Sequence, residues 1–75
     1  MNAHEAVKSV LRVTGTSGRA ASKAIGRGPT YISATLNKPR AMQSNTLAAI
    51  AAACGYELVL RPRDGADGEA FVIDE

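Results

Sequence analysis

The stretch over residues 17–37, which reads SGRAASKAIGRGPTYISATLN, constrains the fold of this chain most strongly. Alanines and an isoleucine recur at helical spacing over residues 18–25, which predicts a short helix. Ser17 is well placed to cap it, because its hydroxyl can accept a hydrogen bond from an orphan backbone N–H. The two glycines of residues 26–28 then end the helix, since glycine adopts a positive φ without penalty.

A second short helix is expected over residues 29–37. Pro29 suits the first turn of a helix, and Ile32 and Leu36 lie four residues apart, so both point toward a core. Two short helices joined by a glycine turn describe a helix-turn-helix motif. The side chains expected on the other faces of this helix are Thr30, Tyr31, Ser33, Ala34 and Asn37.

An amphipathic helix is predicted before this motif, over residues 2–13. Asn2 followed by Glu5 resembles a capping box, and His4, which has no second ligand at metal-binding spacing, is expected to face solvent. The apolar stripe consists of Ala3, Ala6, Val7, Val10 and Leu11.

A further helix is predicted after the polar, proline-containing loop of residues 37–43. Ser44 or Asn45 would cap this helix, and Gly55 would stop it. Its buried face would consist of Leu47, Ile50, Ala51 and Cys54, the cysteine acting as a small buried hydrophobe.

The tail changes character after this helix. Residues 56–61 are aromatic, β-branched and roughly alternating, which predicts a strand, and residues 70–73 would form a second strand across a glycine-rich turn. The chain therefore divides into a helical part, residues 1–55, and a tail, residues 56–75, that forms either a single strand or a hairpin. Such a short hairpin is marginal alone, and its open edges invite pairing with another chain.

Charge is distributed unevenly along the 75 residues. Residues 56–75 contain two cations and six acids, a net charge of −4, whereas residues 1–55 contain one acid, Glu5, and seven cations, a net charge of +6. The net positive charge of residues 1–55 suggests a polyanionic partner, although ordinary solvation of a small domain would also use such residues. The seven cations are Lys8, Arg12, Arg19, Lys23, Arg27, Lys38 and Arg40.

No combination of residues typical of an enzyme active site is visible in the sequence. Histidine beside a nucleophile, paired inward carboxylates and a GxxxxGK phosphate loop are all missing, and one cysteine permits neither an internal disulfide nor a cysteine-based zinc cluster. We therefore expect a non-enzyme without cofactor or metal. No apolar leader or membrane-spanning stretch is present, so a cytoplasmic location is expected.

The order of these elements resembles the lambda-repressor-like (Cro/XRE) helix-turn-helix DNA-binding proteins. The resemblance runs from about Val7 to Leu60 and is carried by AIGRGPTYIS, NKPRAMQSNTL and AAIAAACGYELVL. It implies a mainly α fold, a four-helix lambda-repressor-like domain with a C-terminal strand or hairpin. Two residues depart from the family: Ser22 stands where alanine is usual, and Gly18 stands where glutamine is frequent. The predicted recognition helix also lacks the glutamine, arginine and glutamate often used to read bases.

The resemblance implies a sequence-specific regulator of transcription, expected to be a repressor, that binds double-stranded DNA as a homodimer. Residues 29–37 would enter the major groove and read bases, phosphates would be held by cations around this helix, and the tail would join two copies. The alternative is an antitoxin or inhibitor whose main partner is another protein. The expected base-reading residues are Thr30, Tyr31, Ser33, Ala34 and Asn37; the phosphate-binding residues are Ser17, Arg19, Lys23, Arg27, Lys38 and Arg40; the dimer contacts are Tyr56, Leu58, Val59, Leu60, Phe71 and Ile73.

Overall fold

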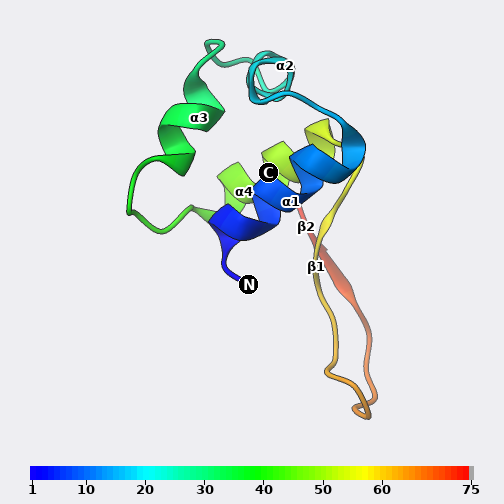
Figure 1. Ribbon diagram of the computed structural model, residues 1–75. Helices are drawn as coiled ribbons and strands as arrows, with labels where there is room; N and C mark the ends of the chain where they lie inside the picture. Colours follow the sequence, from blue (N-terminus) through cyan, green and yellow to red (C-terminus); the bar gives the residue numbers. More distant parts are fainter. Residues whose placement is uncertain (75) are drawn as a thin grey trace.

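The computed structural model describes residues 1–74 as four helices followed by a two-stranded antiparallel sheet (Figure 1). The prediction of a mainly helical chain is confirmed, and the tail forms a hairpin rather than a single strand. Glu75, counted above among the acids of the tail, lies outside the described residues. The elements are α1 (Ala3–Thr14), α2 (Gly18–Ala24), α3 (Tyr31–Leu36), α4 (Ser44–Ala53), β1 (Leu58–Leu60) and β2 (Phe71–Ile73).

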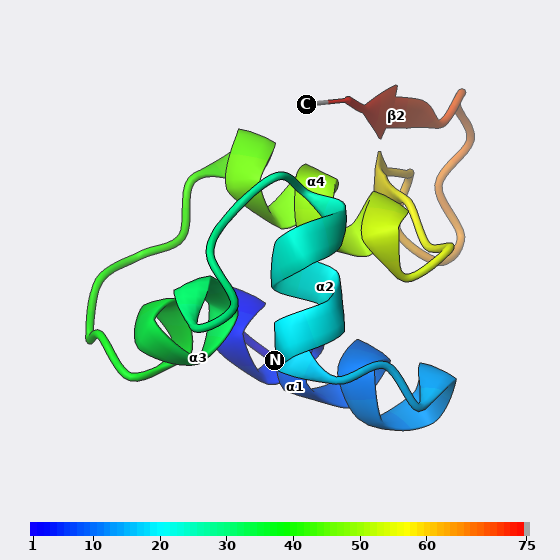
Figure 2. The same cartoon turned by 90° about the horizontal axis from the view of Figure 1, so that it is seen from above.

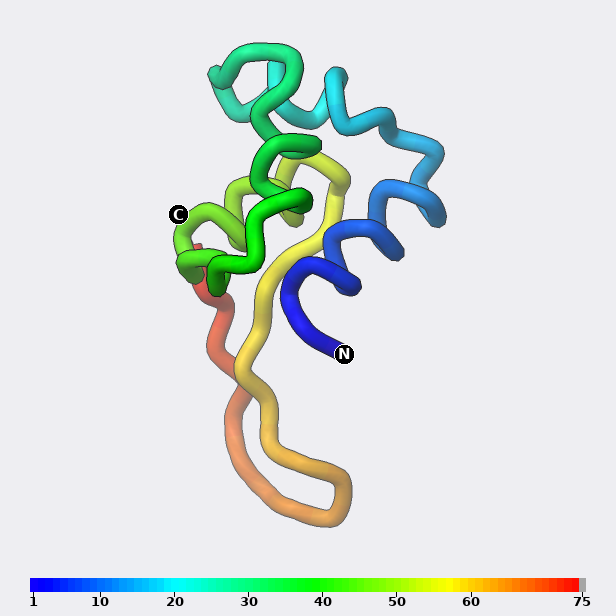
Figure 3. The backbone as a smooth tube through the Cα atoms, turned by 60° about the vertical axis from the view of Figure 1, so that its left-hand side comes forward, coloured from blue at the N-terminus to red at the C-terminus, as the bar shows by residue number. Residues whose placement is uncertain are grey.

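The helices form a small body from which the hairpin projects. α1 and α4 pack together, α2 contacts α4 and α3, and both strands contact α4 at the base of the hairpin. Figure 2, a view from above, shows α2 lying across the α1–α4 pair with α3 to one side. The tube in Figure 3 shows the hairpin leaving the body and turning back far from the helices. The molecule is consequently elongated, with principal extents of 41 × 24 × 21 Å.

The core takes one buried side chain from each helix: Val7, Ala21, Ile32 and Ile50. Each of these four side chains is at most 1% exposed. The sequence has no tryptophan, and these four core side chains are all aliphatic. Half-buried side chains that complete the core are Leu11, Ile25, Tyr31, Leu36, Met42 and Leu47.

The predicted capping box at the start of α1 is confirmed. The Glu5 N–H donates to Asn2 Oδ1 at 2.9 Å, and the Asn2 N–H donates to Glu5 Oε1 at 3.0 Å. Two orphan donors are therefore satisfied reciprocally. The helix ends at Thr14, one residue later than predicted, because Gly15 takes the left-handed conformation with φ of 68°.

The prediction that Ser44 or Asn45 caps α4 is wrong. Gln43 occupies the N-cap position without a side-chain hydrogen bond, and Ser44 is already helical. The Asn45 carboxamide instead accepts from the N–H of the next residue, Thr46, at 2.9 Å. A cap is worth only about 1 kcal/mol, so burial of the helix against its neighbours outweighs it here. The predicted buried face is confirmed at Ile50, and Ala48 and Ala49 are buried in addition.

The hairpin is shorter than its sequence pattern predicts. The predicted strands over residues 56–61 and 70–73 are reduced to three paired residues each, with Val59 opposite Val72 at the centre. Gly55 ends α4 as predicted, with φ of 76°, and the Tyr56 N–H donates to the Ala51 carbonyl at 2.8 Å. Among the described residues, no helix combines the length and apolar character needed to cross a bilayer.

Candidate nucleic-acid interface

The first half of the candidate site is α2 and the turn that follows it. Ser17 caps α2 as predicted, since its Oγ accepts from the Ala20 N–H at 3.0 Å. Gly26 adopts φ of 78° and its N–H donates to the Lys23 carbonyl, which turns the chain away from the helix. Gly28, the second glycine of the turn, has no positive φ. One glycine therefore provides the left-handed residue that this turn requires.

α3 is shorter than the predicted recognition helix of residues 29–37. Pro29 and Thr30 belong to the turn, and the helix covers only Tyr31–Leu36, about 9 Å at 1.5 Å per residue. At its start, Thr30 makes no side-chain capping bond. At its end, Pro39 disfavours helical backbone at the residue before it, so the helix stops soon after Leu36.

Ser22, one of the two residues that depart from the lambda-repressor-like pattern, joins α2 to α3. Its side chain is fully buried, and its Oγ accepts from the Ile32 N–H at 3.0 Å while donating to the Gly18 carbonyl at 2.6 Å. The Ile32 N–H belongs to the first turn of α3, where backbone donors have no partner within the helix. Because Thr30 leaves these donors uncapped, Ser22 supplies from the neighbouring helix the bond that an N-cap side chain would make.

We expect Ser22→Ala to lower the free energy of unfolding by about 1–2 kcal/mol, because it leaves the buried Ile32 N–H without a partner. Urea denaturation followed by circular dichroism would measure the change. Ser33→Ala is the matched control: that hydroxyl also donates to a backbone carbonyl, of Thr30 at 3.0 Å, but it is exposed. Equal losses in the two variants would contradict the special role of Ser22.

The proposed base-reading residues are presented differently by α3 and its flanks. Tyr31 is half-buried against the core, and its ring lies under the Arg27 guanidinium, with 5.0 Å between the guanidinium carbon and the ring centroid. The Ser33 hydroxyl proton is engaged by the Thr30 carbonyl, so its oxygen remains free to accept. The exposed members of the predicted set are Thr30, Ser33, Ala34 and Asn37.

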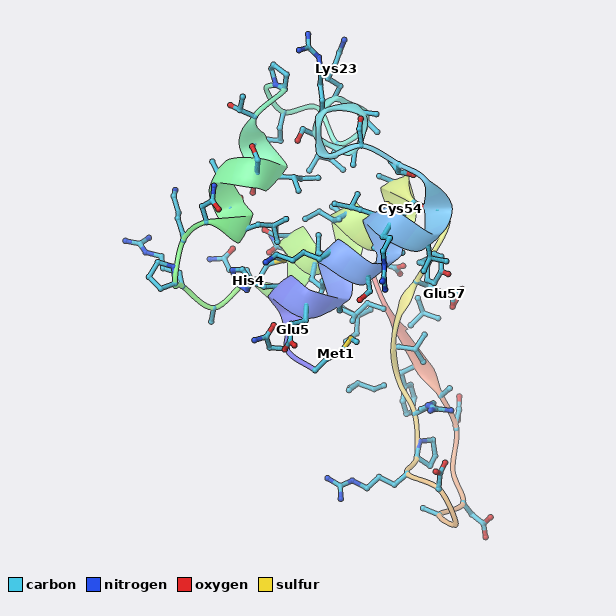
Figure 4. All side chains as sticks on the ribbon, in the orientation of Figure 1. Met1, His4, Glu5, Lys23, Cys54 and Glu57 are labelled. Carbon is cyan, nitrogen blue, oxygen red and sulfur yellow. The ribbon has the colours of Figure 1, made fainter. Side chains whose placement is uncertain are left out.

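The predicted phosphate-binding side chains are all exposed. They come from three segments bordering α3: α2 with its cap, the turn, and the loop after α3. Figure 4 shows Lys23 projecting from the end of the molecule opposite the hairpin. Residues 56–74 contain two cations and five acids. The hairpin that carries this negative charge points away from the basic segments (Figure 1). The predicted set is Ser17, Arg19, Lys23, Arg27, Lys38 and Arg40.

Asn45, which the sequence suggested only as a helix cap, and Thr46, to which it gave no role, lie beside this site. Together with Ile25, Arg27, Tyr31 and Ala49, they line a polar recess of about 240 Å³. No short sequence pattern indicates that Arg27 and Asn45 lie near each other, because they line one recess only when α2 packs against α4. Ser22 is the other residue whose role the sequence did not reveal, although its departure from the family pattern marked the position.

The predicted dimer contacts are mostly uncovered in the single chain. Tyr56, Leu60 and Phe71 are 49%, 63% and 59% exposed, whereas Leu58 and Ile73 are half-buried at the base of the hairpin. Val72, outside the predicted set, is also exposed. It is the cross-strand partner of Val59, so the two valines lie on the same face of the hairpin.

His4 contradicts its predicted exposure to solvent. The side chain is half-buried, and its Nε2 atom is buried without a hydrogen-bond partner. Cys54 is half-buried at the end of α4 and is not in a disulfide. Over residues 1–74, no three side chains of histidine, cysteine, aspartate or glutamate gather closely enough to hold a metal ion.

No protein-family model matches the chain, and neither do the curated proteins or solved structures with which it was compared. A function for this chain therefore has to be argued from its own residues and their arrangement.

Proposed function

We propose that this chain is a double-stranded DNA-binding regulator of transcription, a cytoplasmic repressor that acts as a homodimer. In this proposal α2 and α3 form a helix-turn-helix of the lambda-repressor-like kind, and α3 lies in the major groove. The observation that carries the proposal is the two-sidedness of α3. Ile32 and Leu36 anchor one side in the core, while Thr30, Ser33 and Asn37 leave polar groups exposed on the other.

The dimensions of α3 support major-groove binding. A helix with its side chains fits a groove about 12 Å wide, and the six-residue length places a few side chains against base edges. Asparagine pairs well with adenine through its carboxamide, and the methyl groups of Ala34 and Thr30 suit a thymine methyl. The small Ala34 side chain also lets the backbone of α3 approach the bases closely.

The charge distribution supports the orientation of the complex. The exposed cations that border α3 suit phosphates, which position a protein on duplex DNA without reading its sequence. The acids of the hairpin would be repelled by the same phosphates, and the hairpin leaves the body away from α2 and α3 (Figure 1). The segment proposed to join two copies is thus kept off the DNA.

Selection of bound sequences from a random duplex pool tests the proposal. We expect the chain to enrich a palindrome with half-sites about one helical turn apart. Replacing Thr30, Ser33 and Asn37 together by alanine should abolish the preference, and Asn37→Ala alone should relax one base pair by about 1–3 kcal/mol. Gln43→Ala is the matched carboxamide control and should keep the preference, since Gln43 is exposed and makes no side-chain capping bond. An unchanged preference in the triple variant would remove α3 from this role.

A protein-interaction module, such as an antitoxin or inhibitor, is the second candidate. It is favoured by the exposed apolar hairpin, which can serve another protein as readily as a second copy. A mobility shift with random duplex at low salt separates the two candidates, because DNA binding requires a shift and the second candidate alone does not.

A further inference from the structure

The hairpin carries apolar side chains on both of its faces. Successive residues of a strand point to opposite sides, so the central pair lies on one face and the two outer pairs lie on the other. An antiparallel sheet with one face toward water normally alternates apolar and polar residues. The three cross-strand pairs are Leu58 with Ile73, Val59 with Val72, and Leu60 with Phe71.

The helical body covers only the base of this hairpin. Leu58 and Ile73 are half-buried next to α4, whereas Leu60 and Phe71, on the same face, continue beyond the helices and stay mostly exposed. Val59 and Val72 on the opposite face are 36% and 52% exposed. The apolar surface of the hairpin is therefore larger than its own chain can cover.

The two edges of the sheet differ in their fitness to pair with a copy of themselves. The β1 segment with its flanks reads Glu57-Leu58-Val59-Leu60-Arg61. If two such segments pair antiparallel about Val59, each Glu57 faces Arg61 of the partner subunit, and each Leu58 faces Leu60 of the partner subunit. The β1 edge is thus self-complementary in both charge and apolarity, as a two-fold contact requires.

The β2 edge lacks this property. Antiparallel pairing of two copies about Val72 would place Asp74 opposite Ala70, with no charge to meet it, and would bring the acidic flanks of β2 together. Continuing the β1–β2 register by one residue also places Asp74 opposite Glu57, two exposed acids. Like charges directly opposite destabilise a sheet, and a guanidinium arriving beside Glu57 at the β1 edge relieves this repulsion.

An apolar groove lies on the β1 side of the hairpin base. It has a volume of about 290 Å³ and is lined by α1, α4 and residues 56–58, among them Val10, Val13 and Tyr56. Within the described chain its lining includes no residue of β2. A strand added at the β1 edge would carry its apolar side chains toward this groove.

We propose that two copies of this chain pair through their β1 strands, antiparallel and centred on Val59, to form a four-stranded sheet in the order β2-β1-β1-β2. The inference rests on the homodimer of the proposed function and specifies its edge, register and charge pairs. Leu60 of each copy then lies beside Leu58 of the partner subunit, where the helical body of that subunit covers it. A free strand edge is replaced by a paired one.

Charge reversal tests the register. Glu57→Arg places two cations opposite each other at both ends of the paired strands, and Arg61→Glu places two acids there. We expect each single variant to weaken self-association roughly tenfold or more in sedimentation equilibrium. An equimolar mixture of the two should form a heterodimer, and the double variant Glu57→Arg/Arg61→Glu should associate like the original chain. Unaltered self-association of both single variants would overturn the register.

Cysteine cross-linking tests the edge. In a Cys54→Ala background, Val59→Cys and Val72→Cys each leave one thiol, and the two sites are cross-strand neighbours in the same hairpin. In the proposed sheet the Cα atoms of the two residues 59 lie about 4.5–5.5 Å apart, within disulfide reach, whereas the two residues 72 lie about 14 Å apart. We expect mild oxidation to yield a covalent dimer from Val59→Cys and not from Val72→Cys.

The outcomes separate this inference from the proposed function because neither readout contains DNA. A preference for cross-linking at residue 72, or a full-length chain that stays monomeric at high micromolar concentration, would overturn the inference. Selective cross-linking at residue 59 without any affinity for duplex would support the inference and reject the proposed DNA binding.

Discussion

Raising the salt concentration from 50 to 200 mM should weaken duplex binding by a factor of roughly 500 for each protomer that neutralises five phosphates. The logarithm of the affinity falls by about 0.9 per neutralised phosphate for each tenfold rise in salt, because bound cations displace condensed counterions. The five exposed cations expected to make these contacts are Arg19, Lys23, Arg27, Lys38 and Arg40. Fluorescence anisotropy with a labelled duplex at several salt concentrations measures the slope.

Single substitutions then assign the phosphate contacts. Lys38→Ala should weaken binding to every sequence about equally and reduce the salt slope by about 0.9. Arg63→Ala is the matched control, since Arg63 is also an exposed cation but lies in the acidic hairpin connection. A salt-independent affinity, or an effect of Arg63→Ala as large as that of Lys38→Ala, would rule out binding through the segments that border α3.

Replacing Ile32 by alanine should lower the free energy of unfolding by about 2–5 kcal/mol. Ile32 is 1% exposed and packs in the core with Val7, Ala21 and Ile50, so its truncation leaves a cavity between the helices. A domain of this size has only about 4–11 kcal/mol of stability in total, at 0.05–0.15 kcal/mol per residue. Thermal and urea unfolding monitored by circular dichroism would show the loss.

The same substitution is expected to damage DNA binding beyond its effect on global stability. α3 has six residues, too few to be helical in isolation, so its position depends on the Ile32 anchor and on the bond from Ser22. Val13→Ala, at a site 67% exposed on α1, should change stability by less than about 0.5 kcal/mol and is the control. A folded Ile32→Ala protein that binds duplex normally would show that α3 is not held as argued.

Local sequence determined the start of α1, the start of α2 and the end of α4. Asn2 with Glu5 begins α1, Ser17 begins α2, and Gly55 ends α4, as predicted. These signals work from sequence because each depends on a side chain bonding a backbone group three residues away, or on the φ that glycine permits. The inward direction of Ile32 follows in the same way from helical spacing.

Prediction failed where distant residues decide the outcome. The cap expected at Ser44 or Asn45 did not form. His4, expected in solvent, is half-buried, because the exposure of a helix face depends on which neighbours pack against it. Local preferences of about 1 kcal/mol are outweighed by tertiary burial at such positions.

The sequence alone determined the order of the helices and the glycine turn between α2 and α3. It also determined that the basic residues are concentrated in residues 1–55 and the acidic residues in the hairpin segment. Only the tertiary structure decided that Ser22 would cap α3 and that Arg27 would meet Asn45 across a recess. It also decided that Leu60 and Phe71 would stay mostly exposed while Leu58 and Ile73 are half-buried at the base of the hairpin. The physical reason is that the signals that start and end helices act over three or four residues. Contacts between elements depend instead on how whole helices and strands pack, which no short segment determines.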